Sequence, residues 1–477
     1  MAAGASVLEG PAGDVLVATR RTFPALLPLV GPVGMLAGIL MLHRRQLVQT
    51  DTWVALVAGR EIARHGLPSH EHLTLIAHGH RWVDQQWLAQ LALYRVERIG
   101  GVGLMIAACT AAALCAFAIA AAAAQARGAS PLSLVFWLPV AFLIGPWGAQ
   151  ARTQSLALPL FAFVLWLILR DPDLRRRSSL WAVPTLCLWA NLHGSVTLGA
   201  AIVAAHALQA LVRTGRRRLP LVLLASAPAS IFASPYALEL PGYYRMMLLH
   251  PPYGHDIVEW ERTTPSIAPL FFALAGVVAL AVLLRRKRLG PAEWVVLGVT
   301  FAAALTAVRI TPWFGLAVLA VVPPLTTRRL GVHDLRGVGA TVTAGALVAG
   351  VLGGLAWMAR QDYAGPANVA AALRAEPPTA RVLANLTLAD WALWEAPNLR
   401  GRVAYDGRPE LLTRREFVDV AVRFERFRAG WARAVQPYTV IVTNRAIAQR
   451  LVASHRGWRA VRRDGGIVLV ERSRGAA

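Results

Sequence analysis

The sequence predicts a mainly α-helical, polytopic membrane protein that ends in a small α/β domain, and three observations indicate this fold class. Only 16% of the 477 residues are charged and 56% are hydrophobic, whereas a soluble protein carries about a quarter charged residues. Apolar windows long enough to cross a bilayer recur through residues 1–359. From about residue 360 onward the chain changes to short alternating runs that are too polar to insert.

The apolar windows predict about 11 transmembrane spans, because each approaches the length that crosses the hydrocarbon layer. The split around residues 191–194 also fits one broken or re-entrant segment. In chain order the predicted spans are Phe23–Leu42, Val102–Ala124, Leu132–Ala149, Ser155–Leu169, Leu180–Asn191, Val196–Val212, Pro220–Ala233, Ile267–Leu284, Glu293–Val308, Trp313–Leu325 and Val338–Met358.

Arginine clusters between the spans predict the topology, because cytoplasmic loops carry the excess of basic residues. The clusters fall in alternate loops, on the same side as the N-terminal arginines. The clusters are Arg175–Arg177, Arg216–Arg218, Arg285–Arg288 and Arg328–Arg329. We therefore expect a multi-pass cell-membrane protein with a cytoplasmic N-terminus and an extracytoplasmic C-terminal domain.

The formal net charge of the chain is +23. The sequence has no zinc knuckle or RNA-recognition signature, so no nucleic-acid partner is expected.

Two outer segments are longer than the others. The first, residues 46–101, contains two amphipathic stretches, Thr52–His65 and Val83–Ile99, whose apolar residues recur at helical spacing. Their tryptophan and arginine content is typical of helices that lie at the lipid headgroups. The second, Ser234 to Ser266, is predicted to be an irregular loop.

The soluble domain, residues 360–477, is predicted to mix strands and helices. Strand-like runs occur at Val382–Leu386, Arg402–Tyr405 and Tyr438–Val442, and a hairpin over Trp458–Glu471 turns near Asp464–Gly466. Helical runs occur at Arg414–Phe427 and Ala446–Ser454.

Two carboxylates in the first outer segment are candidate catalytic groups. Asp51 follows the first span directly, and Asp84 begins the second amphipathic stretch. At the outer membrane surface such a group can act as a general base on an acceptor hydroxyl. The alternative for each residue is the simpler role of capping the helix that follows it. Neither has the spacing of a known metal-ligand motif, so no metal site is predicted.

Arg152 and Arg309 lie at outer ends of spans, where the topology rule disfavours basic residues. A guanidinium there matches the geometry of a phosphate group, which predicts a lipid-phosphate-binding role. The alternative is that these side chains extend to the bulk headgroups.

A polar break at Asn191 and His193 interrupts an apolar run. Such breaks usually line a cavity, so both residues are candidate substrate-binding groups. A histidine satisfied by a neighbouring helix is the alternative. Glu259 in the second outer segment is a weaker candidate.

The sequence contains no Walker loop, GxSxG elbow or dinucleotide fingerprint. No cofactor is predicted, and dependence on a divalent metal stays open.

Distinctive motifs are spread over nearly the whole chain. They are Asp51–Thr52–Trp53, Gly59–Arg60–Glu61–Ile62, the run from Gly79 to Leu88, the run from Trp189 to Gly194, Ser234–Pro235–Tyr236 and Tyr405–Asp406–Gly407–Arg408. Together they resemble the bacterial membrane proteins related to GT-C glycosyltransferases, a group that includes protein mannosyltransferases and lipid A aminoarabinose transferases. The sequence departs from the mannosyltransferases, whose first outer loop has paired Asp and Glu, and from the WWDYG-type motif of oligosaccharyltransferases.

The resemblance implies a donor sugar linked to an isoprenoid phosphate, catalysis at the outer membrane face, and Asp51 as the base. We therefore expect a membrane glycosyltransferase, for hexosyl or pentosyl transfer, acting on a glycan, lipid or protein acceptor. Asp406 and Arg408 of the outer domain are expected to bind the acceptor or to cap the site. The alternative is a non-catalytic lipid or glycan transporter or a cell-envelope assembly subunit. Transporters usually contain matched repeat halves, and the sequence shows only one broken segment.

Overall fold

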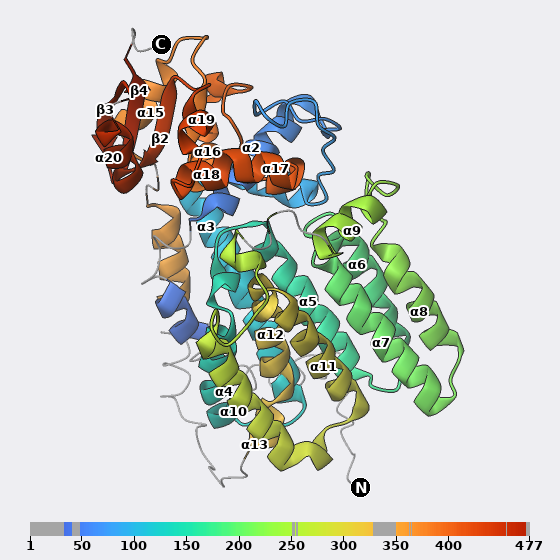
Figure 1. The fold of residues 1–477 in the computed structure, drawn as a ribbon. Coiled ribbons are helices and arrows are strands. Elements are labelled where there is room, and N and C mark those ends of the chain that lie inside the picture. Colours follow the sequence, from blue (N-terminus) through green and yellow to red (C-terminus); the bar gives the residue numbers. More distant parts are fainter. Residues whose placement is uncertain are drawn as a thin grey trace, which may run out of the picture.

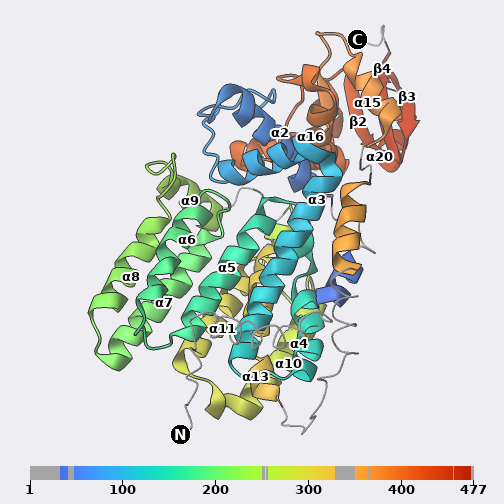
Figure 2. The same ribbon diagram turned by 180° about the vertical axis from the view of Figure 1, so that it is seen from behind.

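The computed structural model describes residues 33–40, 48–249, 253, 256–327, 350–361, 363, 365–454 and 456–473. A bundle of roughly parallel and antiparallel helices forms one end of the molecule, and the C-terminal α/β domain sits on the other end (Figure 1). The reverse view shows the same two-part arrangement (Figure 2). The predicted first and last spans lie partly outside the described residues.

The helices of the first outer segment begin at the boundary between bundle and domain. Helix α2 (Thr50–His65) matches the first amphipathic stretch, and α3 (Trp87–Ala126) contains the second stretch from Trp87 onward together with a predicted span. The two parts of α3 meet at a kink, where Gly101 has φ +74. This left-handed conformation favours glycine, because a side chain there would meet its own backbone. The kink therefore lets an outer helix continue directly into a span.

The remaining bundle helices follow the predicted spans closely. Among the described residues, four helices are long and apolar enough to cross a membrane: α3, α5, α7 and the segment Pro269–Arg288. Four shorter apolar helices accompany them, and the number of spans stays a prediction. The bundle helices after α3 are α4 (Pro131–Ile144), α5 (Thr153–Arg170), α6 (Ala182–Trp189), α7 (Val196–Thr214), α8 (Arg218–Ser230), α10 (Pro269–Arg285), α11 (Pro291–Thr306), α12 (Thr311–Val321) and α13 (Pro323–Thr326).

The arginine clusters after α5, between α7 and α8, and between α10 and α11 lie at the end of the bundle farthest from the C-terminal domain (Figure 1). The second outer segment differs from the prediction of an irregular loop, because it contains helix α9 (Leu240–Leu249). Burial of Leu240 and Met247 on one side of α9 supplies the apolar contact that a short helix needs.

The C-terminal domain contains a four-stranded sheet in the order β1-β2-β4-β3. Strand β1 (Val382–Ala384) pairs in parallel with β2 (Val440–Asn444), and β3 (Trp458–Asp464) forms the predicted hairpin with β4 (Ile467–Arg472). The main helices of the domain are α15 (Ala367–Arg374), α16 (Leu386–Glu395), α17 (Arg414–Phe417), α18 (Arg423–Glu425), α19 (Trp431–Val435) and α20 (Arg445–Ala453).

Two local predictions for this domain need correction. The run Arg402–Tyr405 is not a strand of the sheet, and its Val403 forms isolated bridges to Thr74 and Val382. The predicted helix over Arg414–Phe427 is divided by a π-helical stretch, Val418–Val422, between α17 and α18. Residue 403 pairs on one side with Val382 of β1 and on the other with Thr74 of the distant outer segment, and local propensity does not register such tertiary pairing.

Backbone hydrogen bonds join the C-terminal domain to the first outer segment. The N–H groups of Leu75 and Ile76 donate to the carbonyls of Val403 and Ala404, at 2.8 and 3.0 Å. Beside them, the Arg60 guanidinium of α2 donates to the carbonyls of residues 393 and 394 at the end of α16. This segment and the domain therefore form one continuous layer over the end of the bundle at which α2 begins.

Candidate functional site

A cavity of about 690 Å³ lies where this layer meets the bundle. Its polar wall comes from the first turn of α2, the residues before α5, the break between α6 and α7, and the turn at 407–410 of the C-terminal domain. Five of the sequence-predicted residues line it together, although they come from segments far apart in the chain: Asp51, Arg152, His193, Arg309 and Arg408.

Asp51 lies in the first turn of α2 but is not the residue that caps it. The cap position belongs to Gln49, whose backbone N–H donates to Thr52 Oγ1 at 3.0 Å. Thr52 Oγ1 in turn donates to the carbonyl of Ala151 at 2.6 Å, next to Arg152 in the chain. The start of α2 is thus hydrogen-bonded to the segment that contains Arg152, and the Asp51 carboxylate faces the cavity.

Two guanidinium groups converge on the Asp51 carboxylate. Arg152 Nη1 lies 3.3 Å from Asp51 Oδ2 and 3.0 Å from Glu259 Oε2. Arg309 Nη2 lies 3.9 Å from the same Asp51 oxygen, and its guanidinium stacks 4.2 Å above the Trp260 ring. Glu259, the weaker candidate in the sequence, is therefore a direct partner of Arg152. We call these four charged residues the open cluster: Asp51, Arg152, Glu259 and Arg309.

The open cluster has the features of an anion-binding site. The Arg152 side chain is only 2% exposed, whereas the Asp51 and Glu259 side chains are each 40% exposed. Arg152 Nε has no hydrogen-bond partner among the described residues. A phosphate in the cavity can take the place of one carboxylate and satisfy the remaining donors, because guanidinium binds phosphate bidentately.

His193 lines the cavity, but Asn191 does not. The backbone N–H of Ser195 donates to His193 Nδ1 at 3.1 Å, so the neutral ring carries its proton on Nε2. Asn191 accepts from Trp87 Nε1 at 2.8 Å and donates to the Ala233 carbonyl at 2.6 Å. Asn191 therefore ties the break between α6 and α7 to the start of α3 and to the segment after α8.

Asp84 is buried beside the cavity rather than in its wall. The side chain is 3% exposed, and its Oδ2 has no hydrogen-bond partner among the described residues. Burial raises the pKa of Asp84 to about 7, and the nearby Arg408 offsets only part of this effect. The adjacent Gln85 lines the cavity instead.

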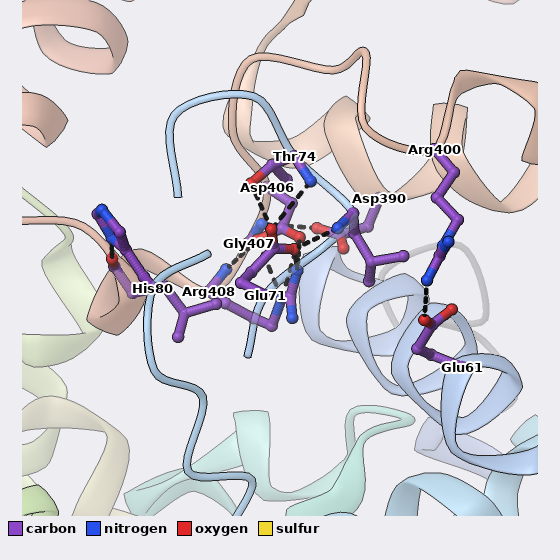
Figure 3. A network of polar contacts seen from close by, with 11 residues as sticks. Glu61, Glu71, Thr74, His80, Asp390, Arg400, Asp406, Gly407 and Arg408 are labelled. Carbon is purple, nitrogen blue, oxygen red and sulfur yellow. Dashed lines mark hydrogen bonds and ion pairs between the residues drawn. The ribbon is translucent and has the colours of Figure 1, made fainter. Parts of the chain in front are cut away.

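Asp406 and Arg408 belong to a second, buried cluster that links the C-terminal domain to the first outer segment (Figure 3). Arg408 Nη2 lies 2.7 Å from Glu71 Oε1, and Arg408 Nε lies 3.0 Å from Asp406 Oδ2. The Arg408 guanidinium also stacks 4.1 Å from the Trp82 ring. We call Glu71, Asp406 and Arg408 the closed cluster, because none of the three side chains is more than 3% exposed.

Gly407 brings the closed cluster against the helix that carries Asp51. Its N–H donates to Asp390 Oδ2 at 2.7 Å, as Figure 3 shows. A Cβ at this position would lie 2.6 Å from Val54 Cγ2 and 2.7 Å from Thr50 Cγ2. Only glycine allows this approach, so the 406–408 turn lies directly on the first turn of α2.

Glu410 also lines the cavity, and sequence reasoning missed it. It follows the Tyr405–Asp406–Gly407–Arg408 motif by two residues and lies on a short 3-10 turn. Burial raises the pKa of Glu410 to about 7. Its closeness to the motif was the only signal in the sequence, because nothing local shows that the turn faces a cavity of the bundle.

Comparison with solved structures found similar chains. ArnT from Cupriavidus metallidurans, bound to undecaprenyl phosphate, shares 13% identity with a TM-score of 0.49, over 94% of this chain and 98% of that one. The archaeal oligosaccharyltransferase AglB from Archaeoglobus fulgidus, in complex with an inhibitory peptide and a dolichol-phosphate, shares 12% identity with a TM-score of 0.43. That match covers 94% of this chain and 74% of the AglB chain. No family model and no curated protein matches the chain.

Proposed function

We propose that this protein is a membrane glycosyltransferase that moves a sugar from a polyprenyl-phosphate donor to an extracytoplasmic acceptor. The observation that carries the proposal is the convergence of Arg152 and Arg309 on one oxygen of Asp51, in the wall of a cavity of about 690 Å³. The sequence motifs and this geometry favour the same chemistry independently.

The open cluster suits the departure of a lipid phosphate. When the sugar leaves, negative charge develops on the phosphate oxygen that carried it. Two guanidinium groups fixed in the cavity wall stabilise that charge without reorganising. His193 Nε2–H lies in the same cavity wall and can donate a hydrogen bond to the donor. The resemblance assigns the acceptor proton to Asp51, which also holds the two arginines in place.

The deeper part of the cavity suits the lipid chain of such a donor. It is lined by apolar residues of two neighbouring bundle helices, Leu198 and Ala201 of α7 and Val299 and Ala303 of α11. An isoprenoid chain lying between these helices would place its phosphate near the arginines. A soluble sugar nucleotide would gain nothing from this apolar surface.

The test is sugar transfer in proteoliposomes, from a panel of labelled polyprenyl-phosphate sugars, with and without added Mg²⁺ or Mn²⁺. We expect wild-type protein to release sugar from at least one donor. Asp51→Asn should lower the rate at least about 100-fold, because it weakens the hold on both arginines and removes a carboxylate from the cavity.

Asp173→Asn is the matched control. Asp173 also pairs with two arginines, Arg175 and Arg213, but it lies after α5 at the opposite end of the bundle. This variant should keep the wild-type rate. If the wild type releases sugar from no donor under any metal condition, the glycosyltransferase proposal fails and the transporter or assembly role gains support.

A further inference from the structure

Neutral amide side chains form a part of the cavity wall that the open cluster does not use. Gln85, Gln86 and Gln154 all line the cavity. The first two directly precede α3, and the third lies in the first turn of α5. Thr153 Oγ1 donates to Gln86 Oε1 at 2.7 Å and so joins the two segments. We call the three glutamines the amide wall.

Two members of the amide wall have buried polar atoms without a partner. Gln154 is 1% exposed, yet neither its Oε1 nor its Nε2 has a hydrogen-bond partner among the described residues. Gln85 is 6% exposed, and its Oε1 likewise has no partner in the described part of the chain. A buried amide that stays unpaired costs free energy, so a ligand that pairs with it gains affinity. Because both amide atoms of Gln154 are unpaired, this side chain offers a donor and an acceptor whichever way its amide is turned.

The amide wall adjoins the arginines of the open cluster. Arg152 is the N-cap residue of α5, and Gln154 is the second residue of that helix. Across the cavity wall, a Cβ on the glycine that follows His193 would lie 3.5 Å from the Gln85 amide carbon. The charges of Arg152 and Arg309 both act on the His193 ring. A sugar attached to the phosphate that these arginines hold would therefore lie beside the amide wall.

The polar atoms of this region suit hydroxyl groups better than charged ones. The acceptors are Oε1 of Gln85 and Gln154, and the donors are Nε2 of Gln154 and of the neighbouring His193. A sugar hydroxyl donates one hydrogen bond and accepts another, so it matches both kinds of group. A carboxylate has no donor for the acceptors, and an ammonium has no acceptor for the N–H groups. Either charged group would leave buried polar atoms unpaired, which is how a hydrogen-bonding site rejects an analogue.

We propose that the amide wall binds the sugar of the donor and selects a neutral hexose or pentose over an amino sugar or a uronic acid. This inference rests on the proposed function, since it places the sugar beside the phosphate held by the open cluster. Gln154 and Gln85 bind ring hydroxyls and take no part in the bond changes. The acceptor proton stays with Asp51, as the resemblance implies.

The first experiment measures binding of undecaprenyl-phosphate donors to the wild type by fluorescence titration in detergent. One set of donors carries glucose, glucosamine or glucuronic acid, and the other carries arabinose or aminoarabinose. In at least one set, the neutral sugar should bind at least about tenfold more tightly than its charged analogues. Charged sugars that bind as tightly as the neutral sugar, or more tightly, in both sets would overturn the proposal.

Two variants of Gln154 separate sugar binding from folding. Gln154→Leu keeps the approximate size of the side chain but removes both amide atoms. It should lower the preference for the neutral donor at least fivefold and change binding of sugar-free undecaprenyl phosphate less than twofold. Gln154→Glu keeps the acceptors and loses the N–H donors, so it should shift the preference toward the amino sugar. An unchanged preference in both variants, or loss of undecaprenyl phosphate binding in both, would contradict the assignment.

Gln209→Leu is the matched control. Both amide atoms of Gln209 in α7 also lack a partner among the residues that the structure describes, but this side chain does not line the cavity. The variant should keep the wild-type preference between donors. A fall in preference equal to that of Gln154→Leu would show that any unpaired amide of the bundle has this effect, against the proposal.

Sugar release from the same donors distinguishes this inference from the proposed function. Selective binding of a neutral donor without release of sugar from any donor would refute the glycosyltransferase proposal and keep the amide wall as a sugar site. Release of neutral and charged sugars at equal rates after equal binding would refute the role of the amide wall and leave the proposed function standing.

Discussion

The open and closed clusters use the same chemistry, arginine with two carboxylates, but place it in different surroundings. In the closed cluster Arg408 and both its partners are at most 3% exposed. In the open cluster the carboxylates that hold Arg152 are each 40% exposed, and the contacts lengthen to between 3.0 and 3.9 Å. Buried charges that have no other partner must stay together. Partly exposed ones can exchange a protein partner for a ligand, so the closed cluster is structural and the open cluster is available for binding.

The largest effect on stability is expected from breaking the closed cluster. Arg408→Met leaves the Glu71 and Asp406 carboxylates buried without their cation, which should lower the free energy of unfolding by about 3–5 kcal/mol. Thermal unfolding of the purified protein in detergent measures this loss. Adding Glu71→Gln and Asp406→Asn should restore most of it, because no unpaired charge then remains buried.

Arg426→Met is the control for this variant. Arg426 is exposed and pairs with Asp256 at 3.5 Å, so its removal should cost less than about 1 kcal/mol. A loss of similar size in both variants would break the distinction between closed and open charge pairs.

The next effect is a pH dependence that comes from Asp84, beside the closed cluster. Its pKa of about 7 in the folded state lies above the ordinary value of 3.8, so the folded protein binds this proton more tightly than the unfolded chain. The contribution of Asp84 to stability is therefore highest below about pH 4. It falls by up to about 1.4 kcal/mol per pH unit up to about pH 7 and is constant above it.

Asp84→Asn should remove this part of the slope and raise stability at neutral pH. Unfolding measured at pH 5, 6 and 7 tests the prediction. Asp173→Asn, which changes an aspartate at the far end of the bundle, should leave the slope unchanged. Identical slopes for Asp84→Asn and wild type would show that Asp84 is ionised in the folded protein.

A smaller effect is expected where the closed cluster rests on α2. Gly407→Ala forces a Cβ to within 2.7 Å of Thr50 and Val54 side-chain atoms, which should cost about 1–3 kcal/mol in unfolding. Because Asp51 lies between these two residues, sugar release should also fall. Gly242→Ala, where a Cβ has open space, should be neutral or stabilise α9 by about 0.5 kcal/mol.

The smallest effect on stability is expected in the open cluster. Arg152→Gln frees two carboxylates that already reach water, so unfolding should change by less than about 1 kcal/mol. The same variant should weaken binding of undecaprenyl phosphate at least tenfold, measured by fluorescence titration in detergent. A large loss of stability with unchanged lipid binding would place Arg152 with the structural residues.

The sequence predicted the open cluster better than the closed one. Asp51, Arg152 and Arg309 stand out because a charge at a span end needs a reason, and all three meet in one cavity. Glu71 gave no such signal, because its partner Arg408 is 337 positions away. Long separation in the chain likewise conceals the pairing of residue 403 with residue 74 and the position of Glu410 in the cavity wall. Local periodicity located most helices, whereas contacts between the first outer segment and the C-terminal domain depend on tertiary pairing.

The bridge between residues 74 and 403 also has a consequence for the order of synthesis. A ribosome completes every bundle helix up to α13 before it makes the turn that closes the cavity. About 80 residues separate the end of α13 from this turn, which takes roughly 4–16 seconds at 5–20 residues per second. Until then the nascent chain does not hold Glu410 or the Gly407 contact with α2. The cavity therefore gains its complete lining only after the C-terminal domain has been made, so the proposed donor site is incomplete on a partly synthesised chain.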